Sequence, residues 1–314
     1  QENQFNDARL NITLLLTSCK LGTCAANHLK ATSFLKEKEN LKGVQVRDML
    51  SGEEFDISAS CIINATGIEL DSIRKWDIAE AQATPTPLHS VHILIDQHTL
   101  PPQMGLMLPK KHSDEMILLH NWEGNTMISY TDSQSTVQCN SEQCFNSEID
   151  EIFKLTDQHL KQKIKKEHIL SYWHNTSMVA KPVSNPFSFS PKQHIVVSPS
   201  KLISLAGGSW TTMRPLVEEA INIAIKEKSL PCKTPSSSSY PPLIGSEKDI
   251  SSTMEILQSH FNLDEDIASH LAHNYGNRSL EIAHICEQGF GQRLSQKFPY
   301  VEAEVIYSVR FEYT

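Results

Sequence analysis

The stretch "LISLAGGSWTTMRPLVEEAINIAIK" (residues 202–226) joins an apolar run to a helical pattern through two adjacent glycines, Gly207 and Gly208. Glycine has no Cβ, so it adopts backbone angles that other residues avoid and lets another molecule approach the main chain. The first turn of a helix also presents unpaired N–H groups that attract an electron-rich ligand. The junction therefore has two interpretations: a bound cofactor or substrate, or a tight turn and nothing more.

A second junction of the same kind occurs earlier in the chain. "CIINATG" (61–67) is an apolar strand that ends in Ala65, Thr66 and Gly67. Two strand ends of this kind can converge on one flat ligand from different sides of a sheet. We therefore expect residues 61–67 and 202–212 to meet in space and to form one wall of a cofactor groove.

The composition limits the class of protein. With 314 residues, 39% hydrophobic and 21% charged, the chain fits an ordinary soluble globular protein with two structural units. A net charge of −9 argues against a nucleic-acid partner. The 7 cysteines are scattered, and neither "CKLGTC" nor "CNSEQC" has a histidine partner nearby, so we expect no metal site. No apolar run approaches the roughly 20 residues that span a bilayer.

Hydrophobic periodicity outlines a mixed α/β body followed by helices. The expected helices cover 6–30, 148–166, the segment after Gly208, and most of 247–314. The expected strands cover 31–35, 43–49, 54–64, 90–96, 104–108, 115–120, 125–131, 168–179, 193–198 and 202–206. A Pro- and Ser-rich segment marks a linker. The predicted domains are a body at 1–230, a linker at 231–246 and a helical domain at 247–314.

Several motifs together make a family recognisable. They are "NDARLN" (6–11), "GEEFDISASCIINATG" (52–67), "MGLMLPK" (104–110), "WEGNTMISYTD" (122–132), "LAGGSWTT" (205–212), "HLAHNYG" (270–276) and "FPYVEAEV" (298–305). In their order and spacing the chain resembles the mitochondrial-type FAD-dependent glycerol-3-phosphate dehydrogenases over nearly its whole length. No single motif decides this; their combination does.

The resemblance implies an α/β (α+β) fold: part of a glutathione-reductase-like FAD-binding fold, an antiparallel substrate-binding sheet and a C-terminal helical domain. It implies FAD as the cofactor and a helix N-terminus that faces the flavin's pyrimidine end, where a reduced flavin carries negative charge. The implied cofactor-binding residues are Ala65, Thr66, Gly67, Gly207, Gly208, Trp210 and Thr211.

The resemblance further implies oxidation of sn-glycerol 3-phosphate to dihydroxyacetone phosphate, with a hydride passing from C2 to flavin N5 and electrons passing to quinone. His92 is then the catalytic proton-transfer residue, although a hydrogen-bonded strand histidine is the alternative. Arg214 either faces the substrate or pairs on a helix surface. The family's place is the inner mitochondrial membrane, and peripheral membrane association and a homo-oligomer stay open.

The chain also departs from the family pattern. It contains no Gly-x-Gly-x-x-Gly motif for the ADP half of FAD, and Ser209 and Ser177 stand where the family has a lysine and an arginine of the substrate phosphate site. Each replaced cation removes a charge-assisted contact of about 1.5–3 kcal/mol. Two other functions therefore stay open: a degenerate paralogue or fragment that acts as an interaction or structural protein, and a flavoprotein oxidase for an uncharged substrate. We expect little or no turnover from this chain alone.

Overall fold

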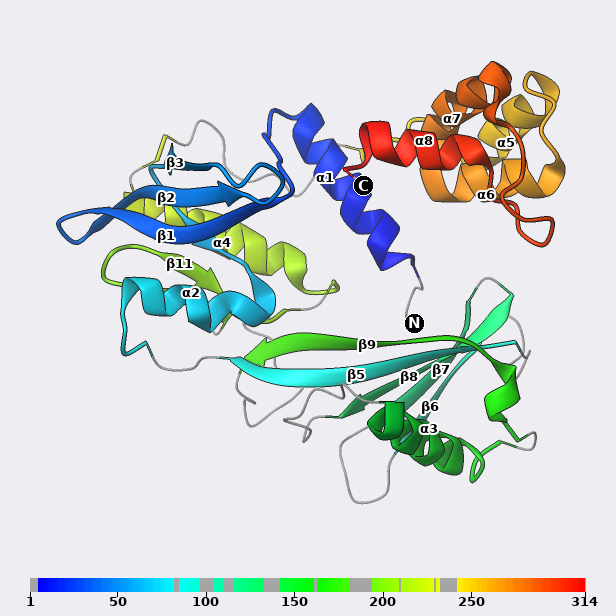
Figure 1. The fold of residues 1–314 in the computed structure, drawn as a ribbon, viewed down its shortest axis with the longest axis horizontal. Coiled ribbons are helices and arrows are strands. Elements are labelled where there is room, and N and C mark those ends of the chain that lie inside the picture. The colour runs from blue at the N-terminus through cyan, green and yellow to red at the C-terminus, as the bar shows by residue number, and fades with distance from the viewer. Residues whose placement is uncertain are drawn as a thin grey trace. The chain divides into compact units, whose positions relative to one another are not determined.

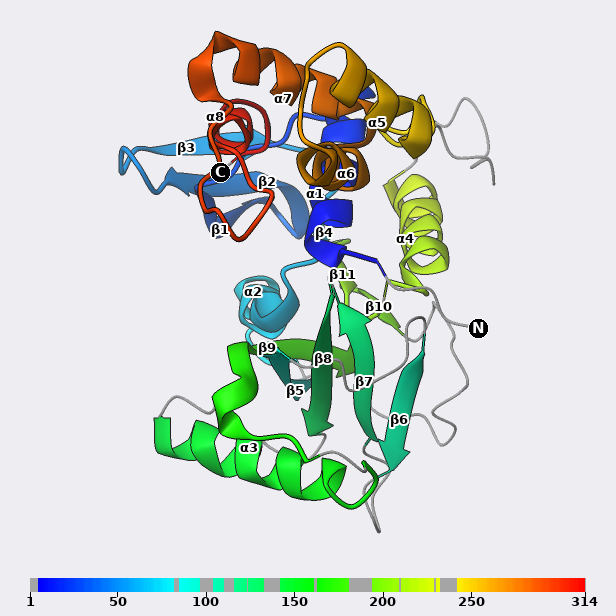
Figure 2. The same cartoon turned by 90° about the vertical axis from the view of Figure 1, so that its right-hand side faces the viewer.

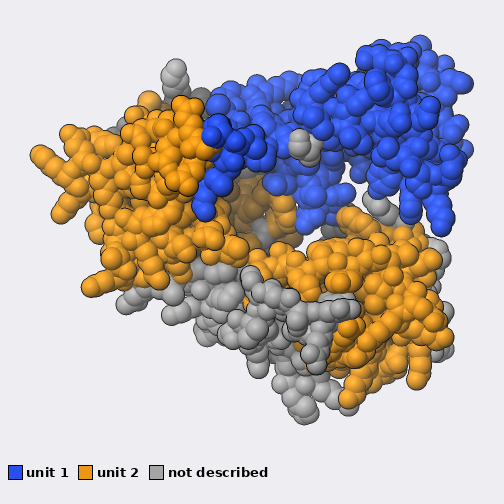
Figure 3. All heavy atoms as spheres, viewed as in Figure 1, with its two compact units in different colours: residues 1–30, 48–51, 235–314 blue, residues 31–47, 52–234 orange. Residues whose placement is uncertain are grey.

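The computed structural model describes residues 5–81, 85–96, 104–109, 116–122, 124–132, 142–160, 163–180, 194–208, 210–228, 230–231 and 242–313. The chain forms two compact units, which Figure 3 colours separately. Unit 1 contains residues 1–30, 48–51 and 235–314, and unit 2 contains residues 31–47 and 52–234. Each unit is described by itself below.

An antiparallel sheet of five strands, in the order β6-β7-β8-β5-β9, dominates unit 2 (Figures 1 and 2). Its strands are β5 (Pro85–Ile95), β6 (Gly105–Pro109), β7 (Met116–Trp122), β8 (Asn125–Asp132) and β9 (Ile169–Ala180), the last entered through the short helix η2 (Lys166–His168). This confirms the antiparallel sheet expected from the sequence.

One face of this sheet is covered by the helix α3 (Glu142–Thr156). Val91, Ile93 and Ile95 alternate along β5 and are buried against Ile149 and Ile152 of the helix. Successive side chains of a strand point to opposite faces, so the residues between them, His92 included, lie on the face away from α3.

Two smaller sheets complete unit 2. The first has the order β1-β2-β3, built from β1 (Leu29–Glu37), β2 (Asn40–Asp48) and β3 (Glu54–Ser58). The second has the order β10-β11-β4, built from β10 (Ile195–Val197), β11 (Ile203–Leu205) and β4 (Ile63–Asn64). β4 leads into η1 (Gly67–Glu69) and α2 (Leu70–Asp77), while α4 (Met213–Lys228) follows β11.

Unit 1 is helical. It contains α1 (Asp7–Lys20), α5 (Ile250–Ser259), α6 (Glu265–Tyr275), η4 (Gly276–Arg278), α7 (Ser279–Ile285), the π-helical turn η5 (Cys286–Phe290) and α8 (Glu302–Phe311). Its core gathers Leu257, Leu271, Ile282 and Tyr307, all fully buried. The helices from α5 onward confirm the helical C-terminal region.

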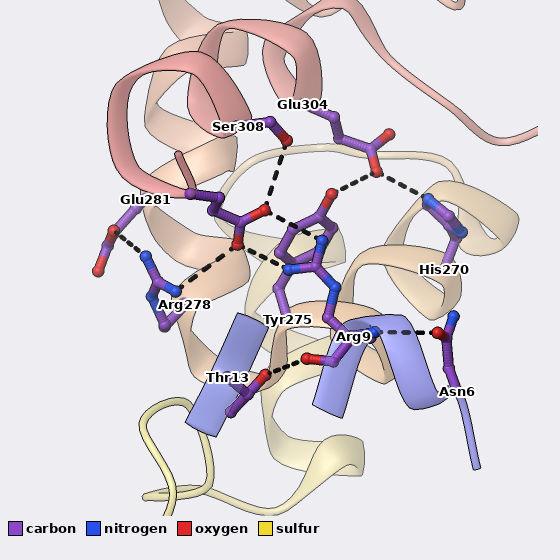
Figure 4. A network of polar contacts seen from close by, with 10 residues as sticks. Asn6, Arg9, Thr13, His270, Tyr275, Arg278, Glu281, Glu304 and Ser308 are labelled. Carbon is purple, nitrogen blue, oxygen red and sulfur yellow. Dashed lines mark hydrogen bonds and ion pairs between the residues drawn. The ribbon is translucent and has the colours of Figure 1, made fainter. Parts of the chain in front are cut away.

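A polar network joins α1 to the end of α8 (Figure 4). Arg9 donates to both carboxylate oxygens of Glu312, at 2.6 and 3.0 Å, and its guanidinium lies 4.4 Å from the centre of the Tyr275 ring. Arg278 approaches the same carboxylate at 3.7 Å. The N-terminal helix thus belongs to the same unit as the C-terminal helices. The boundaries 1–230, 231–246 and 247–314 stay a prediction, since a compact unit need not be one contiguous segment.

Several expected element bounds differ from the structure: the helix expected over 148–166 is α3, which ends at Thr156, and the strand expected over 54–64 divides into β3 and β4. The helix expected over 6–30 ends at Lys20, because Gly22 adopts φ +104° just beyond it and the chain enters β1 at Leu29. The strands expected over 168–179 and 193–198 do form, but in different sheets: β9 pairs with β5, and β10 pairs with β11. Periodicity predicts strands and carries no information about which strands pair.

Candidate functional site

The two glycine-ended strands lie side by side in one sheet. β4 and β11 are parallel, with Ile203 opposite Ile63 and Ser204 opposite Asn64. Because parallel strands run in the same direction, the chain leaves both strands at the same edge of the sheet. Gly67 and Gly207 follow shortly after the last paired residues of β4 and β11. The expected meeting of segments 61–67 and 202–212 is confirmed.

All three glycines at this edge have positive φ angles: +59° at Gly67, +77° at Gly207 and +112° at Gly208. Added to Gly208, a Cβ would lie 3.0 Å from Cδ2 of Leu216, so packing alone favours glycine there. Among the described atoms, a Cβ on Gly67 would meet nothing within 4 Å. Ala65, Thr66 and Gly67 are exposed. Gly67 therefore offers bare backbone with room beside it for another molecule.

Asn64 shapes the first turn, and sequence reasoning missed it. This side chain is 3% exposed, accepts hydrogen bonds from the Thr66 N–H and hydroxyl at 3.3 and 2.8 Å, and donates to the Leu70 carbonyl at 3.1 Å. An asparagine that ends an apolar run two residues before a threonine is the signal that could have found it. Since the Thr66 hydroxyl and N–H are both taken by Asn64 and its carbonyl accepts from the Glu69 N–H at 3.2 Å, Thr66 offers a ligand packing contacts and no spare backbone donor.

The second turn leads into α4. Trp210 is half-buried and Thr211 is exposed just before the helix, while Ser209 lies outside the described residues. A helix N-terminus favours negative charge and unpaired acceptors. The open backbone at Gly67 and the start of α4 together fit a flat, electron-rich group such as a flavin ring.

His92 lies in the five-stranded sheet with partners on both neighbouring strands. It is directly opposite Ser129 of β8 and Trp173 of β9. Its Nδ1 is 2.9 Å from the Ser129 Oγ, and its ring stacks on Trp173 with centroids 5.4 Å apart and planes 20° apart. The imidazole is half-buried on the face away from α3. It is thus held in place and still partly accessible.

The rest of this face mixes polar, aromatic and thioether side chains with Leu94 and Leu118. His120 of β7 lies opposite Met127, on the same face as His92, and its ring meets Trp122 edge-on at 6.4 Å. Burial lowers the pKa of the His120 imidazole, and its Nδ1 has no hydrogen-bond partner among the described residues. Burial therefore favours the uncharged form of His120.

The sheet also reaches the first glycine turn. Cα atoms of β9 lie within 8 Å of those of η1, the short helix that begins at Gly67. The strand that carries Trp173 therefore passes beside the turn that offers its bare backbone. Within unit 2, the fold thus brings the five-stranded sheet that carries His92 next to the turn that follows β4.

The residues expected at the substrate phosphate site are described only in part. The backbone of Ser177 lies in β9 opposite Leu88, and its side chain is outside the described part of the chain. Arg214 is exposed at the start of α4 and forms an ion pair with Glu218 one turn further on, at 3.4 Å. This ion pair agrees with one of the two expectations for Arg214, pairing along the helix surface.

Two further observations concern ligands and membranes. Within the described ranges, no group of three or more His, Cys, Asp or Glu side chains could hold a metal ion. None of the helices in the described part combines the length and the apolar character that crossing a bilayer requires.

Comparison with known proteins places these features in context. Residues 236–314 match the family model for the C-terminal domain of alpha-glycerophosphate oxidase. The chain is 33% identical to the mitochondrial glycerol-3-phosphate dehydrogenase of Bos taurus over 327 residues, which is 98% of this chain and 44% of that protein. It is 31% identical to a probable mitochondrial glycerol-3-phosphate dehydrogenase of Dictyostelium discoideum over 331 residues, covering 99% of this chain and 52% of that protein.

The same fold occurs in a solved structure. The glycerol-3-phosphate dehydrogenase from Bacillus halodurans, complexed with FAD, is similar with a TM-score of 0.80 at 19% identity, over 99% of this chain and 62% of that one. The fold expected from the sequence is confirmed. The chain spans about half the length of the curated relatives it matches.

Proposed function

Since this chain is a homologue of the mitochondrial FAD-dependent glycerol-3-phosphate dehydrogenases, we propose that it forms the substrate-side part of such an enzyme. The reaction is the oxidation of sn-glycerol 3-phosphate to dihydroxyacetone phosphate. The observation that carries this proposal is the parallel pairing of β4 with β11, which gathers two glycine turns at one edge. The His92 sheet passes beside one of those turns.

The cofactor in this proposal is FAD, which supplies a hydride acceptor when bound. Gly67 approaches it through its backbone, and the neighbouring Ala65 and Thr66 pack against it. Gly207 and Gly208 approach it from the second strand. Trp210 and Thr211 lie at the start of α4, whose N-terminal N–H groups favour the electron-rich end of a flavin. The positive φ angles and the open space at Gly67 support this assignment.

His92 is the proton acceptor in this proposal. When the C2–H bond of the substrate breaks with its electron pair, the C2 hydroxyl must lose a proton as the carbonyl forms. An imidazole is a suitable general base for that proton, and the contact of Nδ1 with Ser129 holds the His92 ring on the open face of the sheet, away from α3. His92 then returns the proton to solvent before the next turnover.

The substrate phosphate needs cationic partners, and the chain is poor in them at the expected positions. Arg214 is the retained cation, and its contact with Glu218 is an exposed helix pair worth at most about 1 kcal/mol, so a dianion can compete for it. Ser177 and Ser209 contribute hydroxyl donors only. We therefore propose weak substrate binding.

In this proposal, the electron acceptor and the cellular location are those of the family. Electrons pass to quinone at the inner mitochondrial membrane, where the protein associates peripherally. A homo-oligomer is compatible with this arrangement.

A second candidate is a non-catalytic member of the family that serves as an interaction or structural protein. The two serines at cation positions and the Arg214–Glu218 pair favour it. It keeps the fold and has no turnover.

Steady-state turnover with a dye acceptor separates the two candidates. We join this chain to the dinucleotide-binding segment of a relative and compare His92→Asn with His89→Asn. His89 lies on the same strand but the opposite face, and Thr176 holds it at 3.0 Å, so it is a matched control. The enzyme proposal predicts that His92→Asn lowers kcat on the order of a hundredfold or more, with the control close to wild type. Flavin binding without turnover in the wild type would favour the non-catalytic candidate.

A further inference from the structure

The motif "CKLGTC" (19–24) contains two cysteines at the end of α1 that have no part in the proposed reaction. Cys19 lies in the last turn of the helix, and Cys24 follows the turn that ends it. Both are free thiols in the described part of the chain, with the Cys19 side chain half-buried and Cys24 exposed. Small thiol reagents in solution therefore reach the pair.

The turn after α1 reverses the chain between the two cysteines. The Gly22 N–H donates to the Cys19 carbonyl at 3.0 Å. One residue further, the Thr23 N–H donates to the Ser18 carbonyl, also at 3.0 Å. This is the Schellman pattern, in which a glycine with positive φ ends a helix, and Gly22 has φ +104°. Cys19 and Cys24 directly follow the two residues that the second of these hydrogen bonds joins.

One phenol lies close to both thiols. The Cys19 Sγ is 3.6 Å from the hydroxyl of Tyr313, whose carbonyl accepts from the Asn27 side-chain amide at 2.8 Å. The Cys19 sulfur, first as a hydrogen-bond partner and then as a charge, raises the pKa of the Tyr313 phenol, and the charge of the Cys24 sulfur adds to this shift. Because the interaction of two charges weakens with distance, both sulfurs lie around the same hydroxyl.

From the reversed chain and the shared phenol we propose that Cys19 and Cys24 form a reversible dithiol–disulfide pair, with a low-molecular-weight disulfide of the glutathione type as the oxidant. One protein thiolate attacks glutathione disulfide and forms a mixed disulfide, while one glutathione thiolate leaves. The second protein thiolate then attacks the protein sulfur of this mixed disulfide and expels the other glutathione. The protein thiols lose two electrons and two protons in total, and the oxidant becomes two glutathione thiols.

Oxidation changes the end of α1. The new bond joins the last turn of the helix to the segment that leads toward β1, and it closes a short loop around Gly22. Cys19 also loses its thiol hydrogen and can no longer donate to the Tyr313 hydroxyl. A disulfide removes open conformations of the loop that it closes. We therefore expect slower hydrogen exchange of the Gly22 and Thr23 amides in the oxidised protein.

Mass spectrometry of the full chain tests the pair without any measurement of turnover. The protein is equilibrated in glutathione buffers of increasing oxidant fraction, quenched with acid and alkylated. Trypsin cleaves after Lys20, so the two cysteines fall on separate peptides, 10–20 and 21–30. The disulfide then appears as a linked pair of peptides, which we predict to be the main oxidised species. Mixed glutathione disulfides on both cysteines as the main product would overturn the proposal.

Two variants sharpen this experiment. In Cys24→Ser, the reaction of Cys19 should stop at the mixed disulfide with glutathione, since the second thiol is missing. Cys61→Ser is the control and should leave the linked pair unchanged. Cys61 is half-buried, and burial raises the pKa of its thiol. Loss of the linked pair in Cys61→Ser would contradict the assignment to Cys19 and Cys24.

The same equilibrium in concentrated urea separates the effect of the fold from nearness in sequence. We predict that the equilibrium constant for forming the disulfide is about tenfold or more higher in the folded protein, because the turn holds the thiols together. An equal or lower constant in the folded protein would show that the fold does not bring the thiols together, and it would overturn the proposal.

Discussion

Asn64 is the single residue that shapes the first glycine turn, through one donated and two accepted hydrogen bonds. We predict that Asn64→Ala lowers the free energy of unfolding by about 1–3 kcal/mol, because the Leu70 carbonyl loses its side-chain donor in a buried place. Urea unfolding measures this loss. Asn40→Ala, at an exposed strand start, should change stability little, and equal losses in both variants would contradict the role given to Asn64.

A second prediction at the residue scale is that Asp77 makes the stability of the protein depend on pH. The Asp77 carboxylate is 2% exposed, pairs with Lys36 at 2.8 Å and accepts from the Ser200 hydroxyl at 2.6 Å. Burial alone would raise its pKa, but these partners and Ser198 outweigh burial and lower the pKa of Asp77. A carboxyl group with a lowered folded-state pKa stabilises the protein above its unfolded pKa of about 4 and loses this contribution as the pH falls further.

Asp77→Asn tests this sign. The variant should be less stable than wild type at neutral pH, and the difference should shrink as the pH falls below about 4. Urea unfolding at several pH values gives both curves, with the exposed Asp56→Asn as the control. A difference that stays constant with pH would show that Asp77 acts by packing and not by charge.

Residue types alone predicted part of the site. The glycines and small residues at two strand ends led directly to the paired edge of β4 and β11. Asn64 and Ser129 were not predicted, since their roles depend on a turn and on a cross-strand register that the sequence does not display. The two alternatives for Arg214 could not be separated either, because Glu218 lies at ordinary helical spacing from it.

At the scale of elements, α1 depends on contacts far away in sequence. Its Arg9 pairs with Glu312, whose side chain is 1% exposed. We predict that Arg9→Ala lowers the free energy of unfolding of unit 1 by about 3–5 kcal/mol, because it removes the two-pronged partner of a buried carboxylate and leaves it with Arg278 at 3.7 Å and the Ser308 hydroxyl at 3.4 Å. Hydrogen exchange of the α1 amides should rise with it.

The matched control lies on the same helix. Lys20 pairs with Glu247 at 3.5 Å with both side chains well exposed, so Lys20→Ala should cost at most about 1 kcal/mol. Equal effects of the two variants would contradict the claim that burial makes the Arg9 contact important.

Helices and strands themselves were largely predictable, and their ends and partners were not. The strand expected over 90–96 forms as the second half of β5, and Asn6 caps α1 by accepting from the Arg9 N–H at 3.0 Å. The predicted helix over 6–30 nevertheless ran past Lys20, because leucines continue beyond the point where Gly22 turns the chain. The contact between α1 and α8 joins residues 303 positions apart, which no local pattern reveals.

At the scale of the whole molecule, the order of several modest motifs predicted a resemblance that the comparisons agree with, since the chain is 33% and 31% identical to two mitochondrial glycerol-3-phosphate dehydrogenases. The chain spans about half the length of those relatives. We therefore expect activity when the chain is joined to a dinucleotide-binding segment. We predict little or no glycerol-3-phosphate oxidation by this chain alone. Joined to a dinucleotide-binding segment, it should bind flavin and turn over with a high KM.

Restoring the two cations tests the reason for that high KM. In the joined protein, Ser177→Arg together with Ser209→Lys should lower the KM for glycerol 3-phosphate by well over tenfold, since each charge-assisted contact is worth about 1.5–3 kcal/mol. The neutral pair Ser177→Gln and Ser209→Gln is the control and should leave KM high. Turnover at low substrate concentration without the basic residues would show that the phosphate binds elsewhere.

In the proposed enzyme, the bare backbone at Gly67, beside β11, lies against a flavin. The visible absorption spectrum of the joined protein tests it most directly, in wild type, Gly67→Asn and Gly52→Asn. Asparagine tolerates positive φ, and both glycines, at +59° and +79°, have open space where a Cβ would lie, so both variants should fold. We predict flavin bands in wild type and in Gly52→Asn, and their loss in Gly67→Asn with an unchanged melting temperature. A folded Gly67→Asn protein with a wild-type flavin spectrum would contradict the account.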